Sequence, residues 1–542
     1  MSTAAIQPEF HTSGIIRLTR AQLFGTMAGL MLSVLLASLD QTIVGTAEPR
    51  IIAQLSGFDR YPWVSTVYLL TSTLAIPIFA RLSDIYGRKW FFLAGCGTFI
   101  LTSALCGASG TMNWLPFDGM SQLIVSRGLQ GIGGGMMMGL AFTIIGDVFS
   151  PAERGKYQGF FAATYGLASI FGPTLGGWLT DHVSWRACFY VNLPVGIVAI
   201  LAIHLYFPYW RPEGVKRTID WSGVASLILS IVPLLLALTW VTDYGWASAR
   251  VIGLLALSVL MLAVFIRAEG RAAEPLIPLI LFRNSIISMS AVASFILGMG
   301  MFGVIIYLPL FMQGVLGVSA TESGNLLTPL LLASVVGSIL TGQMNLRLRT
   351  YKPSAVVGSI FIAAGMILFA RMDASTSHGE VLIGMLVAGF GMGQLMPVYT
   401  VAIQNAAARE HMGAASALPT FCRSIGSTVG VAIFGTILLT NYQRDFARSA
   451  PRGTPESLLK PFANPLMLAQ IRPQLNQLFA GYADGLNLLK SLLGNVRAAL
   501  VHGINLIFVT SAVIMTLAVV LNLLLRSAPL KHGAPKVEAP PH

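Results

Sequence analysis

Charged residues are scarce in this chain. Asp, Glu, Lys and Arg make up 10% of its 542 residues, whereas they supply roughly 25% of an ordinary soluble protein. Hydrophobic residues reach 55%, so much of the folded surface must face lipid instead of water. The composition excludes a soluble globular protein and predicts an all-α integral membrane protein that crosses the bilayer many times.

Cysteines are also few. The four cysteines, Cys96, Cys106, Cys188 and Cys422, all fall in apolar stretches, and no two have the close spacing of a metal-binding pair. Cys96 and Cys106 lie about 15 Å apart along one helix, which is too far for a disulfide bond. We therefore expect buried thiols that pack as small apolar side chains, and no metal or other cofactor.

Three other signatures are missing. No nucleotide-binding loop of the form G-x-x-x-x-G-K-[ST] occurs, so we expect no use of ATP. The 34 Lys and Arg residues are scattered between apolar stretches, so a net charge of +12 does not indicate nucleic-acid binding. The eight histidines are dispersed, and no Ser, His and Asp cluster or metal-ligand set indicates an enzyme.

Long hydrophobic runs, in contrast, are abundant. About 20 apolar residues span a bilayer as a helix, and the first run is too long for a cleaved signal peptide. A pair of runs at 221–241 and 250–267 is almost free of charge, which predicts a membrane hairpin between two groups of six helices. The fourteen expected spans lie near 22–46, 63–81, 91–110, 121–145, 158–180, 187–207, 221–241, 250–267, 287–312, 323–343, 354–371, 381–403, 415–439 and 501–525.

The expected spans divide the chain and orient it. Twenty of the 34 Lys and Arg residues lie on the side that the termini share, and five lie in the short loops opposite, so the positive-inside rule predicts cytoplasmic termini. The expected parts are a cytoplasmic segment 1–20, a first bundle 21–207, the hairpin with its linkers 208–285, a second bundle 286–526 that includes a long external loop 441–500, and a cytoplasmic tail 527–542.

Three charged residues interrupt the apolar runs: Asp40, Arg127 and Arg423. A charge at a helix centre costs about 2.5–3.5 kcal/mol on insertion scales, so such residues usually face a water-filled cavity or a partner. Asp40 is therefore a candidate proton or cation site, with a solvated position near the membrane surface as the alternative. Arg127 opens the run RGLQGIGGGMMMG, whose glycines suit close helix packing, because Met136 replaces the third glycine of a dinucleotide fingerprint.

Several ordered motifs resemble the major facilitator superfamily. The loop ARLSDIYGRK at 80–89 is similar to that superfamily's signature loop, with Ala80 in place of a usual glycine, and GLASIFGPTLGGWL is similar to its antiporter motif. The runs LDQTIVGTAEP, SWRACFYVNLP, DWSG and EPLIPLILFRN follow in the order expected for its 14-helix drug:proton antiporter branch. The resemblance covers roughly residues 20 to 440, and an ordered set of motifs is more specific than any one of them.

The resemblance implies an architecture and a mechanism. It implies two pseudo-symmetric six-helix bundles plus the extra hairpin, alternating access, and a multi-pass position in the cell (inner) membrane. It assigns Asp84, Arg88 and Asp147 to a charge network that latches the inner gate. It assigns the hinge or close contact of the antiporter motif to Gly166, Gly172, Pro173, Gly176 and Gly177.

The resemblance also assigns proton coupling. Asp40 becomes the expected coupling carboxylate, and Arg127 a candidate for proton transfer. In the two-bundle arrangement Arg423 faces the cavity opposite the first helix, so we expect Asp40 and Arg423 to face one cavity and to interact in at least one state. A static structural ion pair is the alternative.

Glu48 departs from the resembled branch, where its place is usually apolar. Gly45 also replaces a common asparagine, and GQMNLRLRTYK, the second-half counterpart of the signature loop, lacks the acidic residue. Glu48 is either a second protonatable site or a solvated surface charge. We favour the surface position, because Pro49 is expected to break the helix and Arg50 can satisfy the carboxylate.

The expected function is proton-coupled export of hydrophobic cationic compounds. Export of lipids or other amphiphiles, with drug efflux secondary, is the alternative. The expected partners are protons, lipophilic small molecules or lipids, and the bilayer, and we expect a monomer. Apolar residues at helical spacing from Leu475 to Leu500 predict an amphipathic helix that runs into the last span and caps the cavity mouth or lies on the outer leaflet.

Overall fold

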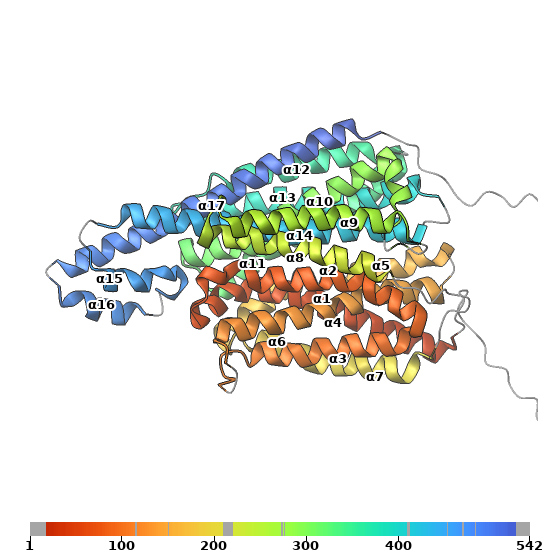
Figure 1. Ribbon diagram of the computed structural model, residues 1–542, viewed down its shortest axis with the longest axis horizontal. Helices are drawn as coiled ribbons and strands as arrows, with labels where there is room; N and C mark the ends of the chain where they lie inside the picture. Colours follow the sequence, from red (N-terminus) through yellow and green to blue (C-terminus); the bar gives the residue numbers. More distant parts are fainter. Residues whose placement is uncertain are drawn as a thin grey trace, which may run out of the picture.

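The computed structural model describes residues 18–113, 116–149, 151–209, 220–272, 275, 277–348, 350–408, 412–451, 454–468, 471–482 and 484–526. Its regular elements are helices, as Figure 1 shows. Thirteen of the described helices are long and apolar enough to cross a membrane. A further long helix, α5 (Pro151–His182), packs against α1 and α11 and contains the fifth predicted span, 158–180.

The first bundle, drawn red to yellow in Figure 1, occupies one half of the molecule. It consists of α1 (Arg20–Leu55), the short 3-10 helix η1 (Phe58–Arg60), α2 (Tyr61–Tyr86), α3 (Arg88–Gly107), α4 (Gly119–Val148), α5, and the pair α6 (Ala187–Tyr190) and α7 (Asn192–Tyr206), which together form one crossing.

The second bundle lies beside the first. It consists of η2 (Leu279–Arg283), α10 (Ser285–Phe311) with the π-helical turn η3 (Met312–Leu316), α11 (Ala320–Leu348), α12 (Lys352–Phe369), α13 (His378–Ala406), α14 (Met412–Ser449) and α17 (Gly485–Leu524). Between α14 and α17 come α15 (Glu456–Leu459), η5 (Lys460–Ala463), η6 (Pro465–Met467) and α16 (Arg472–Ala480).

The two bundles repeat one packing pattern. In the first bundle α2 packs on α4, α3 on α4, α1 on α5 and α1 on α7. The second bundle has the corresponding pairs α11 with α13, α12 with α13, α10 with α14 and α10 with α17. The bundles meet through α5 against α11 and, symmetrically, α14 against α2. This repetition confirms the predicted pseudo-symmetry.

The extra hairpin, α8 (Trp221–Tyr244) and α9 (Ala249–Glu269), lies at the boundary between the bundles. Side chains of α8 share an apolar cluster with Leu70 and Leu74 of α2 and with Val429 and Ala432 of α14. The hydroxyl of Thr436 in α14 also donates to a backbone carbonyl of α8, at 2.5 Å. The hairpin therefore contacts both bundles along one seam.

Two ends of the molecule can be distinguished in Figure 1. The helix α1 begins and α17 ends at one end, called here the terminal end, and α15 and α16 project from the opposite end, called the loop end.

At the loop end, hydrogen bonds join the bundles: Tyr61 Oη donates to the Ile306 carbonyl at 3.2 Å and Gln313 Nε2 to the Thr46 carbonyl at 3.0 Å. Thr321 also donates to Asp181, from its backbone at 2.7 Å and its hydroxyl at 2.5 Å. The loop-end seam is closed in this structure.

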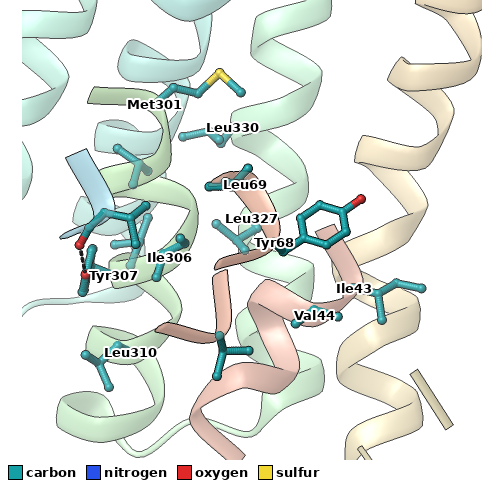
Figure 2. Packing of buried hydrophobic residues seen from close by; sticks show 14 of the residues in the cluster. Ile43, Val44, Tyr68, Leu69, Met301, Ile306, Tyr307, Leu310, Leu327 and Leu330 are labelled. Atoms are coloured by element: carbon teal, nitrogen blue, oxygen red, sulfur yellow. Dashed lines mark hydrogen bonds between the residues drawn. The ribbon is translucent and has the colours of Figure 1, made fainter. Parts of the chain in front are cut away.

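A continuous apolar core fills the space between the bundles. Figure 2 shows side chains of α1, α2, α10 and α11 packed together, with Tyr307 hydrogen-bonded through its hydroxyl to the Val431 carbonyl at 2.9 Å. The labelled residues of this core are Ile43, Val44, Tyr68, Leu69, Met301, Ile306, Tyr307, Leu310, Leu327 and Leu330.

The predicted external loop 441–500 is largely helical. The helix α14 continues to Ser449 and α17 already begins at Gly485, so the helix expected to run into the last span is present from Gly485 onward. It does not start as early as Leu475, because Asp484 has a left-handed backbone (φ 58°) that separates α16 from α17. The predicted tail 527–542 and nearly all of the segment 1–20 lie outside the described residues.

Candidate functional site

Asp40 lies on α1 and is wholly buried, not solvated at the surface. Its Oδ2 accepts from Arg127 Nη1 of α4 at 2.6 Å, and its Oδ1 accepts from Gln130 Nε2 of α4 at 2.9 Å and from Asn192 Nδ2 of α7 at 3.2 Å. One carboxylate thus receives three donors from two other helices of its own bundle. Such charge-assisted hydrogen bonds are shorter and stronger than those between neutral groups.

Arg127 links the carboxylate to α2. Its side chain is 2% exposed, and its Nη1 also donates to Gln130 Oε1 at 2.8 Å, while its Nε donates to the Val64 carbonyl at 3.4 Å. Its guanidinium carbon lies 4.2 Å from the ring centre of Tyr68, one turn further along α2, in cation–π geometry. Loss of the negative charge at Asp40 would therefore alter its direct contacts with α4 and, through Arg127, the contacts between α4 and α2.

The amide side chains at this site were missed by the sequence analysis. Gln130 and Asn192 are wholly buried, and Asn192 also donates to Ser103 Oγ of α3 at 3.1 Å. The Asn192 carbonyl oxygen has no hydrogen-bond partner among the described residues. One signal was available: Gln130 follows Arg127 by three residues, so both lie on one face of a helix.

Arg423 is not a partner of Asp40 in this structure. It is half-buried on α14, at the crossing with α10, where its backbone carbonyl would lie 2.0 Å from a Cβ placed on Gly298. Arg127 takes the position beside Asp40 that the sequence analysis gave to Arg423. The expectation that Asp40 and Arg423 interact in another state remains a prediction.

The expected surface position of Glu48 is wrong. Glu48 is wholly buried, and Ser65 of α2 lies 3.1 Å from each of its carboxylate oxygens. The physical reason is that Pro49 does not end the helix: α1 continues to Leu55. Arg50 is exposed and forms no ion pair with Glu48.

The predicted inner-gate residues lie at the terminal end. Arg88, at the start of α3, donates from Nε to Asp147 Oδ2 near the end of α4 at 2.8 Å and from Nη1 to Ser83 Oγ at 2.8 Å. Arg88 is 4% exposed and Asp147 14%. The side chain of Asp84 lies outside the described part of the chain. The structure therefore brings two of the three predicted residues together.

The glycines of the antiporter motif place α5 between the bundles. A Cβ on Gly172 would lie 2.0 Å from Thr42 Oγ1, and one on Gly176 would lie 2.6 Å from the Ile43 carbonyl, both on α1. A Cβ on Gly177 would lie 2.3 Å from the Ala320 carbonyl of α11 in the other bundle. These spacings leave no room for a side chain.

The remaining residues of the motif follow the same division. The Pro173 carbonyl closely approaches Gly324 of α11, where a Cβ would lie 2.1 Å away. Gly166 has ordinary contacts, since its Cβ would lie 3.9 Å from Val335. The motif therefore makes two tight contacts, one within the bundle and one between bundles.

An open groove of about 500 Å³ lies at the loop end, between α2, α4, α8 and α14. Trp63, Phe117 and Trp240 line it, with the exposed carboxylate of Asp59 at one side. Aromatic faces and one carboxylate are a chemistry that suits a lipophilic cation. Arg60, also in the lining, pairs with Asp118 at 2.7 Å and lies 3.5 Å from the Asp59 carboxylate, and its hydrogen bond to Asp118 holds the pKa of Asp118 well below its usual range.

The described residues contain no cluster of three or more His, Cys, Asp or Glu side chains that could hold a metal ion. The four cysteines are unpaired, three of them buried and Cys422 half-buried. Burial as small packing residues is what the sequence predicts for them.

The fold and the site together define a class of protein: a helical membrane protein of two pseudo-symmetric bundles with a buried ion pair in the first bundle and a glycine-lined seam between the two. The family model described as "Major Facilitator Superfamily" matches residues 30–431. The chain belongs to the major facilitator superfamily.

Its relatives include bacterial and fungal proteins. The chain is 40% identical over 413 residues to "Multidrug transporter protein MdtP" of Bacillus subtilis (strain 168), covering 76% of this chain and 74% of that protein. It is 38% identical over 410 residues to "Multidrug resistance protein 3" of the same organism, with 76% and 78% covered. It is 31% identical over 496 residues to "MFS-type efflux pump MFS1" of Trichophyton rubrum, with 89% and 90% covered.

Solved structures share the fold at low identity. The crystal structure of a bacterial homologue of the human lysosomal transporter Spinster, in an inward-facing and occupied conformation, superposes with a TM-score of 0.63 at 14% identity. The match covers 94% of this chain and 100% of that chain. This similarity supports the two-bundle fold and nothing more specific.

Proposed function

We propose that this protein exports hydrophobic cationic small molecules across the cell membrane in exchange for protons, by alternating access. The observation that carries the proposal is the wholly buried Asp40, ion-paired with Arg127 at 2.6 Å inside the first bundle. The names of its relatives, multidrug transporter and efflux pump, support export of drug-like compounds. Nothing in the comparisons favours lipid export.

A proton on Asp40 would change what holds the first bundle together. The neutral acid loses its ion pair with Arg127, and a buried guanidinium without a counter-charge is costly. Arg127 would then rely on Gln130, the Val64 carbonyl and the ring of Tyr68. Since Val64 and Tyr68 lie on α2, which meets α14 of the other bundle, protonation biases the seam between the bundles.

The remaining parts have roles in the same cycle. The Arg88–Asp147 pair would latch the terminal-end gate, with Asp84 as a further member. The glycines of α5 would form the closed loop-end seam. The positive-inside rule supports cytoplasmic termini, so the loop end would face outward. A monomer is sufficient, because both bundles and the site belong to one chain.

The proposal is tested with Asp40→Asn reconstituted in liposomes. Asparagine keeps the size but cannot bind or release a proton, so we expect efflux driven by an imposed pH gradient to be lost. Counterflow of a lipophilic cationic dye, which needs alternation but no net proton movement, should remain, and its persistence shows that the variant is folded. Undiminished pH-driven efflux by Asp40→Asn would contradict the proposal.

A further inference from the structure

Glu48 is a second buried carboxyl, and it faces the seam between the bundles. It lies eight residues after Asp40, about 12 Å further along α1 toward the loop end. One turn before it, Gly45 faces the other bundle, since a Cβ there would lie 3.6 Å from the Ile305 carbonyl of α10. Between these two positions, the Thr46 carbonyl accepts from Gln313 at 3.0 Å, across the same seam.

The closed seam provides an ionised Glu48 with few groups that would stabilise its charge. Within the described residues its hydrogen-bond partner is Ser65, and it forms no ion pair. A buried ionised carboxylate without a paired cation is strongly disfavoured. Ser65 Oγ has one proton but lies 3.1 Å from both carboxylate oxygens, a geometry that lets a neutral Glu48 accept from the hydroxyl or donate to it.

The other ionisable groups around Glu48 do not replace a counter-ion. Tyr61 of α2 and Tyr307 of α10 interact with it electrostatically and are wholly buried. Their hydroxyls donate to the Ile306 and Val431 carbonyls instead. Arg127 of α4 also interacts with Glu48, but it is ion-paired with Asp40. Its charge is therefore already compensated.

We propose that Glu48 is a gate carboxyl: it must bind a proton before the loop-end seam can close, and it releases that proton to water when the seam opens. The inference rests on the alternating access of the proposed function. Because Glu48 is buried at the closed seam, its proton returns to the side from which it came. Glu48 therefore sets the pH dependence of closure, while Asp40 couples transport.

The direction in which pH shifts the seam follows from the difference in bound protons between the open and closed states. The open state binds one proton fewer at Glu48, so a rising pH favours opening. For one proton released, the ratio of open to closed molecules rises by up to about tenfold per pH unit. Glutamine at this position cannot ionise, so it should leave the seam closed at any pH.

The experiment measures this ratio from the distance between two spin labels. Asp59 and Gln443 are exposed and lie in different bundles at the loop end, where both line a second, smaller groove beside Phe58 and Tyr442. Cysteines at these two positions, in a chain without its four native cysteines, therefore report opening. The measurement uses the Asp40→Asn/Arg127→Gln background, in which the coupling carboxylate no longer titrates and no uncompensated guanidinium is left to pair with Glu48. From about pH 5 to pH 9 we expect the open fraction to rise in this background and to stay low and flat once Glu48→Gln is added.

Two further variants keep the test decisive. Glu48→Leu should fold, because it is apolar like its surroundings, and should also give a flat profile. Glu322→Gln removes an exposed carboxyl from the loop end of α11 and should leave the rise with pH unchanged. An equal rise with and without Glu48 would overturn the gate role. That outcome is separate from a failure of proton coupling, which the efflux of Asp40→Asn reports.

Discussion

At the scale of single residues, one carboxylate ties four helices together. Asp40 of α1 receives donors from α4 and α7, and its partner Arg127 extends the network to α2. Replacing a buried ion pair as a whole can be neutral, whereas removing one member leaves an uncompensated charge that costs about 3–5 kcal/mol. The two residues should therefore be strongly coupled in stability.

A double-mutant cycle of Asp40→Asn and Arg127→Gln tests this coupling. We expect Arg127→Gln alone to lower the free energy of unfolding in detergent by about 3–5 kcal/mol. The double variant should be more stable than the sum of the two single losses predicts, by about 1–3 kcal/mol. Thermal and denaturant unfolding provide the measurement, and additive losses would show that the pair is not a unit.

The sequence identified the charged residues that lie in apolar runs, but it did not identify the residues with which they interact. Asp40 and Arg127 stood out because each is a charge in an apolar run, but the run itself does not say which charges meet. Arg423 was chosen on a two-bundle argument, while the structure forms the pair within one bundle, between α1 and α4. Glu48 was misplaced because a proline was taken to end α1, although the helix continues for six residues beyond it.

At the scale of elements, α5 acts as a spacer with two faces. Gly172 and Gly176 lie against α1, and the neighbouring Gly177 lies against α11 of the other bundle. The motif could be recognised from the order of these residues in the sequence. Which glycines contact α1 in the same bundle, and which contacts α11 in the other, is known only from the packing in the structure. In the proposed alternating access, the Gly177 contact is the one of the two that must break when the loop end opens.

Gly177→Ala should therefore disfavour the closed loop end. Its methyl group would lie 2.3 Å from the Ala320 carbonyl, and overpacking of this kind costs about 1–3 kcal/mol. The open fraction, measured with the same label pair, should rise by about fivefold to a hundredfold, with slower transport. Gly97→Ala on α3 has no atom within 4 Å of its new methyl group and is the matched control. Identical effects of the two substitutions would contradict a special role for Gly177.

At the scale of the whole molecule, the segment from α15 to α16 connects the second bundle to the end of α1. Asn464 Nδ2 donates to the Ile52 carbonyl at 3.2 Å, and Ser56 Oγ, at the end of α1, donates to the Met467 sulfur at 3.6 Å. The segment therefore adds contacts between the bundles at the loop end and should favour the closed seam.

One contact shows where a deletion of the segment from α15 to α16 can be closed. Asn495 Nδ2 donates to the Ser449 carbonyl at 2.7 Å, so a short Gly/Ser turn in place of residues 451–493 joins α14 to α17 where they already meet. We expect normal membrane insertion, because all membrane helices remain, with a larger open fraction and an altered transport rate or substrate range. Loss of the protein from the membrane would instead assign the segment a role in folding.

The different surroundings of the two buried carboxyls have an electrical consequence. If Asp40 alone carries a proton across while the proton of Glu48 returns to its own side, each cycle exchanges one proton for one substrate. For a monovalent cation this exchange moves no net charge, and a membrane potential acts only on net charge, at about 2.3 kcal/mol per elementary charge per 100 mV. Such a transporter would follow the proton concentration difference and be indifferent to voltage.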